Sequence, residues 1–138
     1  MPHPNLEVIN RFFEAHSQRN MDDLKQVLAE NARWISYGQP SHSGVSNGFD
    51  EVVAFLDMME GLIRRTNSRV EKIIESTDDN YVIECWRLWT DAEDGEKLDQ
   101  LVCVLWKFEN SKIVEGRHFF ADPTAADIVI SYISAFQS

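Results

Sequence analysis

Hydrophobic and polar positions along the chain repeat with two different periods, one in each half. In the first half, apolar residues recur every three or four positions, as on one face of an amphipathic helix. This spacing predicts three helices: one capped by Asn5, a short one capped by Asn20, and a third across residues 52–62. A short strand at residues 32–37 and a Gly- and Ser-rich loop at residues 38–48 separate the second helix from the third.

The second half carries the pattern of β-strands. Runs rich in Val, Ile, Trp and Phe predict four strands, at residues 69–76, 80–90, 97–109 and 111–121. The links between them are short, which favours antiparallel neighbours. In the last segment, Thr124 followed by Asp127 is typical of a helix start, although the β-branched run that follows would also suit a strand.

Helices followed by a run of strands predict an α+β fold in a single domain of residues 1–138. The helices can cover one face of the sheet. The strands at 81–90 and 98–108 are apolar on both faces, so the other face needs a cover as well. A partner subunit would supply it, and we therefore expect a homodimer formed through the outer face of the sheet.

Composition and charge narrow the functional classes. The formal net charge of −10 argues against nucleic acid or an anionic membrane as a partner. No apolar run approaches the ~18 residues of a membrane span and the N-terminus lacks a signal-peptide layout, so we expect a cytoplasmic protein. Four Trp, eight Phe and three Tyr favour an apolar pocket or an adhesive dimer face.

The residue types that bind metals or form covalent intermediates give no pattern of their own. The four histidines lack the spacing of metal ligands, and we interpret Cys85 and Cys103 as buried, unreactive thiols in the middle of strands. We therefore expect no metal and no cofactor.

Three stretches give the chain a family resemblance: "LAEN" followed by Trp34, "SG" followed by "NGFDEVVAF", and the closing "KIVEGRHFFAD". With the order of helices and strands, they resemble the nuclear-transport-factor-2-like superfamily, in its SnoaL-like branch of polyketide cyclases and relatives of ketosteroid isomerase. The resemblance implies a cone-shaped fold, a cystatin-like roll in which a strongly curved antiparallel sheet wraps around a pocket closed by N-terminal helices. It also implies homodimers through the outer sheet face and leaves the chemistry open.

The closing strand contains two candidate catalytic residues, His118 and Asp122. The resemblance implies that an aspartate ending this strand faces the pocket, and Asp122 is at or near that place. The strand end is one residue longer here, so either a β-bulge absorbs the extra residue or Asp122 is displaced. Strand alternation puts His118, Phe120 and Asp122 on one face, with His118 and Asp122 about 13 Å apart. Asp122 is then a general acid or base with a pKa raised by burial, or a solvated helix cap. His118 contacts the ligand or is a hydrogen-bonded residue of the pocket wall.

Aromatic residues supply further candidate ligand contacts. Trp34 and Phe120 offer rings, and Tyr37 offers a phenol beside the Gly/Ser loop, where it can also be a rim residue. Trp86 and Trp89 must point to opposite faces of their strand, so only one of them can line the pocket. Trp89 is our candidate, with Trp86 as the alternative.

Arg87 is the remaining candidate contact, because a guanidinium in an apolar strand needs an acidic partner or water. It can clamp a carboxylate or enolate oxygen of a ligand. It can equally form an ion pair with Glu84, Glu115 or Asp122, or lie exposed on the outer face of the sheet.

These features favour a protein that binds a small, partly apolar molecule in an aromatic pocket. Its chemistry would be cofactor-free acid/base isomerisation, cyclisation or a lyase step. Asp122 would move the proton, His118 would assist, and Arg87 or Tyr37 would stabilise an enolate-like oxygen. The alternatives are a module that binds its ligand without chemistry and a dimerisation domain with a closed core.

Overall fold

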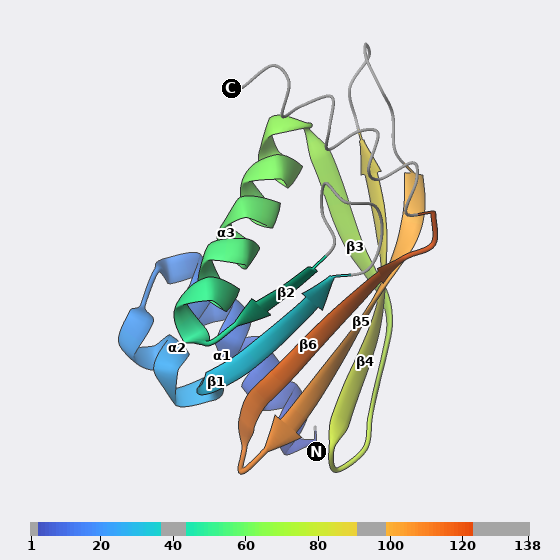
Figure 1. The fold of residues 1–138 in the computed structure, drawn as a ribbon. Coiled ribbons are helices and arrows are strands. Elements are labelled where there is room, and N and C mark those ends of the chain that lie inside the picture. The colour runs from blue at the N-terminus through green and yellow to red at the C-terminus, as the bar shows by residue number, and fades with distance from the viewer. Residues whose placement is uncertain (1–2, 37–43, 91–98, 123–138) are drawn as a thin grey trace.

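The computed structural model describes residues 3–36, 44–90 and 99–122, which form helices packed on one side of a curved sheet (Figure 1). None of the helices in these ranges is both long and apolar enough to cross a membrane. The elements along the chain are α1 (Pro4–Gln18), α2 (Met21–Val27), β1 (Leu28–Ser36), β2 (Gly44–Asn47), α3 (Phe49–Arg65), β3 (Ser68–Thr77), β4 (Tyr81–Thr90), β5 (Asp99–Glu109) and β6 (Lys112–Phe120).

The helix starts follow local capping chemistry. Asn20 caps α2 as predicted, because its side chain accepts a hydrogen bond from the backbone N–H of Asp23. The prediction that Asn5 caps α1 is wrong. His3 is the cap and Pro4 is the first helical residue, since proline fixes a helical φ and has no N–H to satisfy. The Asn5 amide instead donates to two carbonyls in the turn between β3 and β4, at 3.2 Å each.

The predicted α+β fold with a strongly curved sheet is confirmed. The six strands lie in the order β2-β1-β6-β5-β4-β3. All neighbours are antiparallel except β1 and β6, which run parallel because the chain crosses from one to the other through β2, α3 and the β3–β5 strands. Two details differ from expectation: β1 begins directly at the end of α2, and β2 forms within the segment predicted as loop. β2 has only four residues, none of them buried, so it carries no alternating pattern. The predicted C-terminal helix lies outside the described residues.

Alternation along β4 separates the two faces of the sheet. Val82, Glu84 and Leu88 are buried on the face that meets the helices. Trp86 shares this inner face, while Trp89 belongs to the outer set and lies beside Arg87, whose guanidinium is 4.3 Å from the centre of its ring. The two tryptophans therefore point to opposite faces, as predicted.

Gly116 is required where the indole of Trp34 crosses β6. The two residues are paired across β1 and β6, and a Cβ at position 116 would overlap ring atoms Cζ3 and Cε3 of Trp34. The Trp34 ring has little room to move away, because it is 5% exposed and packs edge-on against Trp106. The missing side chain at 116 thus creates the space in which the Trp34 ring lies.

We predict that Gly116→Ala destabilises the protein by about 1–3 kcal/mol, the usual cost of overpacking a close-packed interior. Urea unfolding followed by circular dichroism measures this change. Gly61→Ala is the matched control, since a Cβ there would make only ordinary contacts with the Arg65 side chain. It should raise stability by up to about 1 kcal/mol, because alanine is the better helix former. Equal stabilities for the two variants would contradict the packing described for Trp34.

Candidate functional site

A cavity of about 310 Å³ lies between α1, α3 and the inner face of strands β3–β6, with Trp34 of β1 in its wall. This volume is at the lower end of the range for small-molecule sites. Rings make up much of its wall, contributed by Phe12, Phe13, Trp34, Phe55, Trp86, Trp106 and Phe120. Among the residues that line it in the described part of the chain, four can titrate (His16, Glu60, Glu84 and His118), and none is Lys or Arg.

Two of these titratable groups flank a valine on the floor of the cavity. Strand pairing aligns Glu84 with Val104, and Val104 with His118, in one row across β4, β5 and β6. The Cα atoms of Glu84 and His118 are therefore two strand spacings, about 10 Å, apart. Glu84 and His118 therefore line the cavity on either side of Val104, with 0% and 5% of their surfaces exposed.

His118 is held in one orientation by two hydrogen bonds. The indole Nε1 of Trp34 lies 2.9 Å from Nδ1 of His118, and Oγ of Ser36 lies 2.9 Å from its Nε2. An indole N–H can only donate, so Nδ1 accepts and the proton of the neutral ring is assigned to Nε2, which donates to Ser36. The ring also stacks on Phe55, with 5.7 Å between centroids. His118 is thus a fixed, hydrogen-bonded residue of the wall.

Glu84 is the most deeply buried ionisable group in the described part of the chain, with 0% of its surface exposed. Trp106 donates its indole N–H to Oε1 at 2.6 Å. Lys72 Nζ lies 3.1 Å from Oε2 as an ion pair, but without the alignment of a hydrogen bond. Burial raises the pKa of Glu84, and the hydrogen bond from Trp106 and the charge of Lys72 only partly oppose this. A carboxyl group whose pKa is raised by burial in a cavity is a candidate functional group.

A β-bulge in β3 brings Lys72 to this carboxylate. Lys72 pairs with Trp86 and Ile74 with Cys85, so one extra residue lies between them. Without it, Lys72 and Glu75 would point to opposite faces of β3, since they are three positions apart. With it, both lie on the inner side, where Lys72 Nζ is 2.7 Å from Oε2 of Glu75.

An ionic cluster forms part of the rim. His16 Nε2 lies 2.8 Å from Oδ1 of Asp57 and His16 Nδ1 lies 3.5 Å from Oε2 of Glu60, while Arg19 pairs with both carboxylates. Burial opposes ionisation of Asp57, but hydrogen bonds from Arg19 and His16 outweigh it and lower the pKa of Asp57. The histidine and the two carboxylates lie within 4.8 Å of one another, close enough to ligate a cation. Arg19 already supplies positive charge there, so we interpret the cluster as a bridge between α1 and α3.

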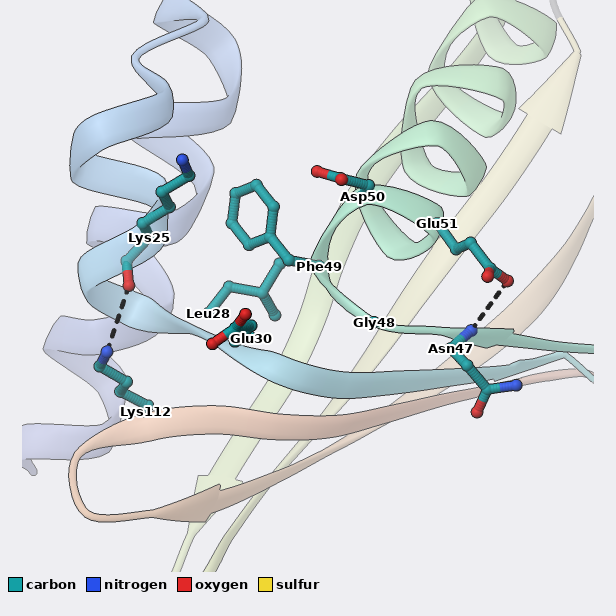
Figure 2. Close-up of a pocket in the computed structure, with 9 residues that line it drawn as sticks. All are labelled: Lys25, Leu28, Glu30, Asn47, Gly48, Phe49, Asp50, Glu51 and Lys112. Carbon is teal, nitrogen blue, oxygen red and sulfur yellow. Dashed lines mark hydrogen bonds between the residues drawn. The ribbon is translucent and has the colours of Figure 1, made fainter.

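A second groove, of about 690 Å³, lies at the start of α3 (Figure 2). Two of its polar residues form hydrogen bonds within the groove. Lys112 donates to the backbone carbonyl of Lys25, and the backbone N–H of Asn47 donates to Glu51 (Figure 2). Asp50 joins Glu51 in the first turn of α3, which suits the helix dipole and repels anions. This mixed-charge groove has no buried titratable group, and the aromatic cavity is the stronger candidate site.

The structure brings together some of the residues predicted from the sequence. Trp34, His118 and Phe120 line the cavity. Asp122 lies exposed just beyond β6, where its backbone exchanges two hydrogen bonds with the Gln100 side chain, and it is not among the lining residues. The register of β6 is thereby set, with His118 and Phe120 facing inward.

Two predicted ligand contacts lie on the outer face instead. Arg87 forms a two-pronged pair with Asp99, at 3.1 and 3.0 Å, and covers Trp89. This corrects the placement of Arg87 and Trp89 in the pocket; Trp86 lines it. The reason is strand parity, since Glu84 and Trp86 face inward and residues 87 and 89 cannot. Tyr37 lies outside the described residues.

Glu84, Lys72 and Glu75 were not among the sequence candidates. The signal for Glu84 is present in the sequence, because it lies between Val82 and Trp86 in an alternating apolar set and must share their face. No comparable signal exists for Lys72, whose inward position depends on the bulge.

Comparisons with known proteins agree with this architecture. An uncharacterised protein of Mycobacterium tuberculosis, Rv0034, is 28% identical over 123 residues, 89% of this chain and 93% of the relative. The solved structure of Bal32a, from a soil-derived mobile gene cassette, aligns with a TM-score of 0.74 at 25% identity, over 91% of this chain and 95% of that one. A protein of Xanthomonas campestris with a cystatin-like fold aligns with a TM-score of 0.70 at 24% identity, over 91% and 96% of the two chains.

The family follows from the sequence profile that the chain matches. The profile of the SnoaL-like domain matches residues 9–116, from within α1 to Gly116 in β6. The chain therefore belongs to the SnoaL-like domain family, within the nuclear-transport-factor-2-like superfamily that its sequence resembles.

Proposed function

We propose that the protein binds a small, uncharged and largely apolar molecule in the aromatic cavity and carries out cofactor-free proton transfer on it. The observation that carries this proposal is the row of Glu84, Val104 and His118, which places an acid and an imidazole on either side of an apolar floor. Catalytic acids and bases are commonly tuned by burial in this way. Isomerisation and cyclisation next to a carbonyl are the reaction types that need only such groups.

The apolar and aromatic lining of the cavity favours one class of ligand. Aromatic and aliphatic side chains favour planar or ring-shaped molecules. An anionic ligand would find no Lys or Arg among the described lining residues, and it would approach a chain of formal net charge −10. A neutral ring system that carries a carbonyl or hydroxyl group fits both conditions.

The cavity is tested with prodan, a neutral two-ring ketone whose fluorescence reports an apolar environment. We expect saturable binding that Val104→Phe weakens at least tenfold, because the added ring fills the floor between Glu84 and His118. Leu105→Phe is the matched control, since Leu105 is the next residue of β5 and faces outward. Absence of saturable binding, or equal binding by both variants, would contradict the proposal that this cavity binds a ligand.

Proton transfer is tested with the same probe in D₂O, because the methylene next to its carbonyl can enolise. We expect deuterium incorporation faster than in protein-free solution, measured by mass spectrometry, and a return to the protein-free rate in Glu84→Gln. Asp122→Asn, at the acid predicted from the sequence, should leave the rate unchanged, because Asp122 is exposed and does not line the cavity. Binding without any acceleration would support the alternative, a module that holds its ligand unchanged.

We also propose that the outer sheet face mediates a homodimer. Ile74, Ile83, Leu101 and Phe119 lie exposed on it across four neighbouring strands. Cys85 and Cys103, predicted to be buried, are half-buried free thiols on the same face. Two ion pairs lie on this face, Arg87 with Asp99 and Arg117 with Glu115. Paired charges lower the desolvation cost of burying the face in an interface.

Light scattering after size exclusion tests the dimer. We expect Leu101→Asp to convert the protein to a monomer at micromolar concentration, because a carboxylate would be desolvated in the centre of the interface. Met58→Asp is the control, since Met58 is similarly exposed but lies on α3. A monomeric wild-type protein at this concentration would contradict the proposal.

A further inference from the structure

We propose that Glu84 is the group that donates and accepts the proton in the cavity, and that Glu75 and Lys72 connect it to solvent at the open edge of the sheet. The inference rests on the proposed function for its reaction type. The charge state of the cluster itself can be measured without any ligand.

Exposure increases stepwise from the cavity to the edge strand. The side chain of Glu84 is 0% exposed, that of Glu75 is 24% exposed and that of Lys72 is 30% exposed. Glu75 is paired directly with Glu84 across β3 and β4, and β3 is the last strand of the sheet. A proton on Glu84 therefore has a carboxylate neighbour that water can reach.

The charges of the cluster favour one retained proton. Lys72 supplies one positive charge to two carboxylates, 2.7 Å from Glu75 and 3.1 Å from Glu84. With both carboxylates ionised, the wall of an apolar cavity would hold an excess negative charge. With one proton the cluster is neutral, and burial assigns that proton to Glu84. The other titratable groups that face the cavity are His16 and Glu60 on the helices and His118 on β6.

The bulge in β3 is the second observation that supports this role. A salt bridge that only fastens β3 to β4 needs one cation and one acid at paired positions on the exposed edge. Here an extra residue is inserted so that both Lys72 and Glu75 reach the inner side, and the acid they meet is sealed from water. Bulges that re-aim side chains in this way are common beside active sites.

The proton balance of the step includes solvent water. The O–H bond of Glu84 at Oε2, the oxygen without an aligned hydrogen bond, breaks as a new O–H bond forms on the ligand's carbonyl oxygen, and the C–H bond next to that carbonyl breaks as its proton passes to water, which leaves a neutral enol. Lys72 and the indole N–H of Trp106 stabilise the carboxylate that remains. Glu75 then passes a proton taken from water to Glu84. The reverse sequence lets Glu84 accept a proton from the ligand, and no electrons are transferred.

The indole N–H signal of Trp106 in ¹⁵N-labelled protein reports the charge of Glu84, because the two groups are hydrogen-bonded. Trp106→Phe assigns the signal. We expect a pH transition with a midpoint above the usual ~4.3 of glutamate, and its loss in Glu84→Gln. Lys72→Met removes a cation and should raise the midpoint by about one unit or more, whereas Glu75→Gln removes a like charge and should lower it. Lys72→Arg keeps the charge and should restore the wild-type midpoint.

Glu71→Gln is the control on the same strand, because Glu71 pairs with Arg87 on the outer face. It should leave the midpoint unchanged. A signal that does not move with pH, a midpoint near 4.3, or equal midpoints in Lys72→Met and Glu75→Gln would overturn the inference. Deuterium incorporation into prodan should slow at least tenfold in Glu75→Gln while its binding is kept; an unchanged rate would remove Glu75 from the path.

Stability gives an independent readout. Because the folded state keeps the Glu84 proton to a higher pH than the unfolded chain, wild-type stability should fall as pH rises from ~4.3 through the folded pKa. Glu84→Gln cannot lose this proton, so its stability relative to wild type should increase over the same window. A constant difference would count against a retained proton. Probe binding without the pH transition would contradict the retained proton on Glu84 but support the ligand site. The pH transition without probe binding would support the retained proton but contradict the ligand site.

Discussion

The contact between two tryptophans, Trp34 and Trp106, determines the geometry of the cavity. Their rings pack edge to face with 5.1 Å between centroids. Each indole gives its single N–H to one ionisable group, Trp34 to His118 and Trp106 to Glu84. Because a buried indole needs an acceptor and a buried carboxylate needs a donor, each bond satisfies two groups that would otherwise be costly inside an apolar wall. The hydrophobic core and the polar pair are therefore parts of one packed unit.

The curved sheet makes this unit possible, and two of its local features place the polar groups. Gly116 leaves room for one indole, and the bulge in β3 supplies the cation that faces Glu84. Two further register shifts lie elsewhere in the sheet, between Lys107 and Phe108 in the pairing of β5 with β6 and between Leu28 and Arg33 in the pairing of β1 with β6. Bulges increase twist and bend a strand, so the same features that curve the sheet around the cavity also direct side chains into it.

Much of the fold could be predicted from the sequence, because its periods are strong. Alternation identified β4–β6, and the 3–4 spacing identified the three helices. The site was only partly predictable. His118 and Trp34 follow from alternation and ring content, but the pattern does not say which of two alternating sets faces inward. That ambiguity explains the choice of Trp89 over Trp86, whereas Asp122 was chosen because of the family resemblance. Lys72 could not be found, since a bulge inserts one residue and reverses the parity that alternation relies on.

An acid in the middle of a strand differs physically from an acid at its end. Asp122 is exposed to solvent just beyond the end of β6. Glu84 lies between neighbouring strands, with no surface exposed to solvent. Such preorganisation is what makes a buried group effective, because Lys72 and the Trp106 N–H are already in position when the carboxylate forms. Under the proposed function, a molecule that reaches Glu84 would have to leave its own water behind, and a neutral, largely apolar molecule does this at the lowest cost.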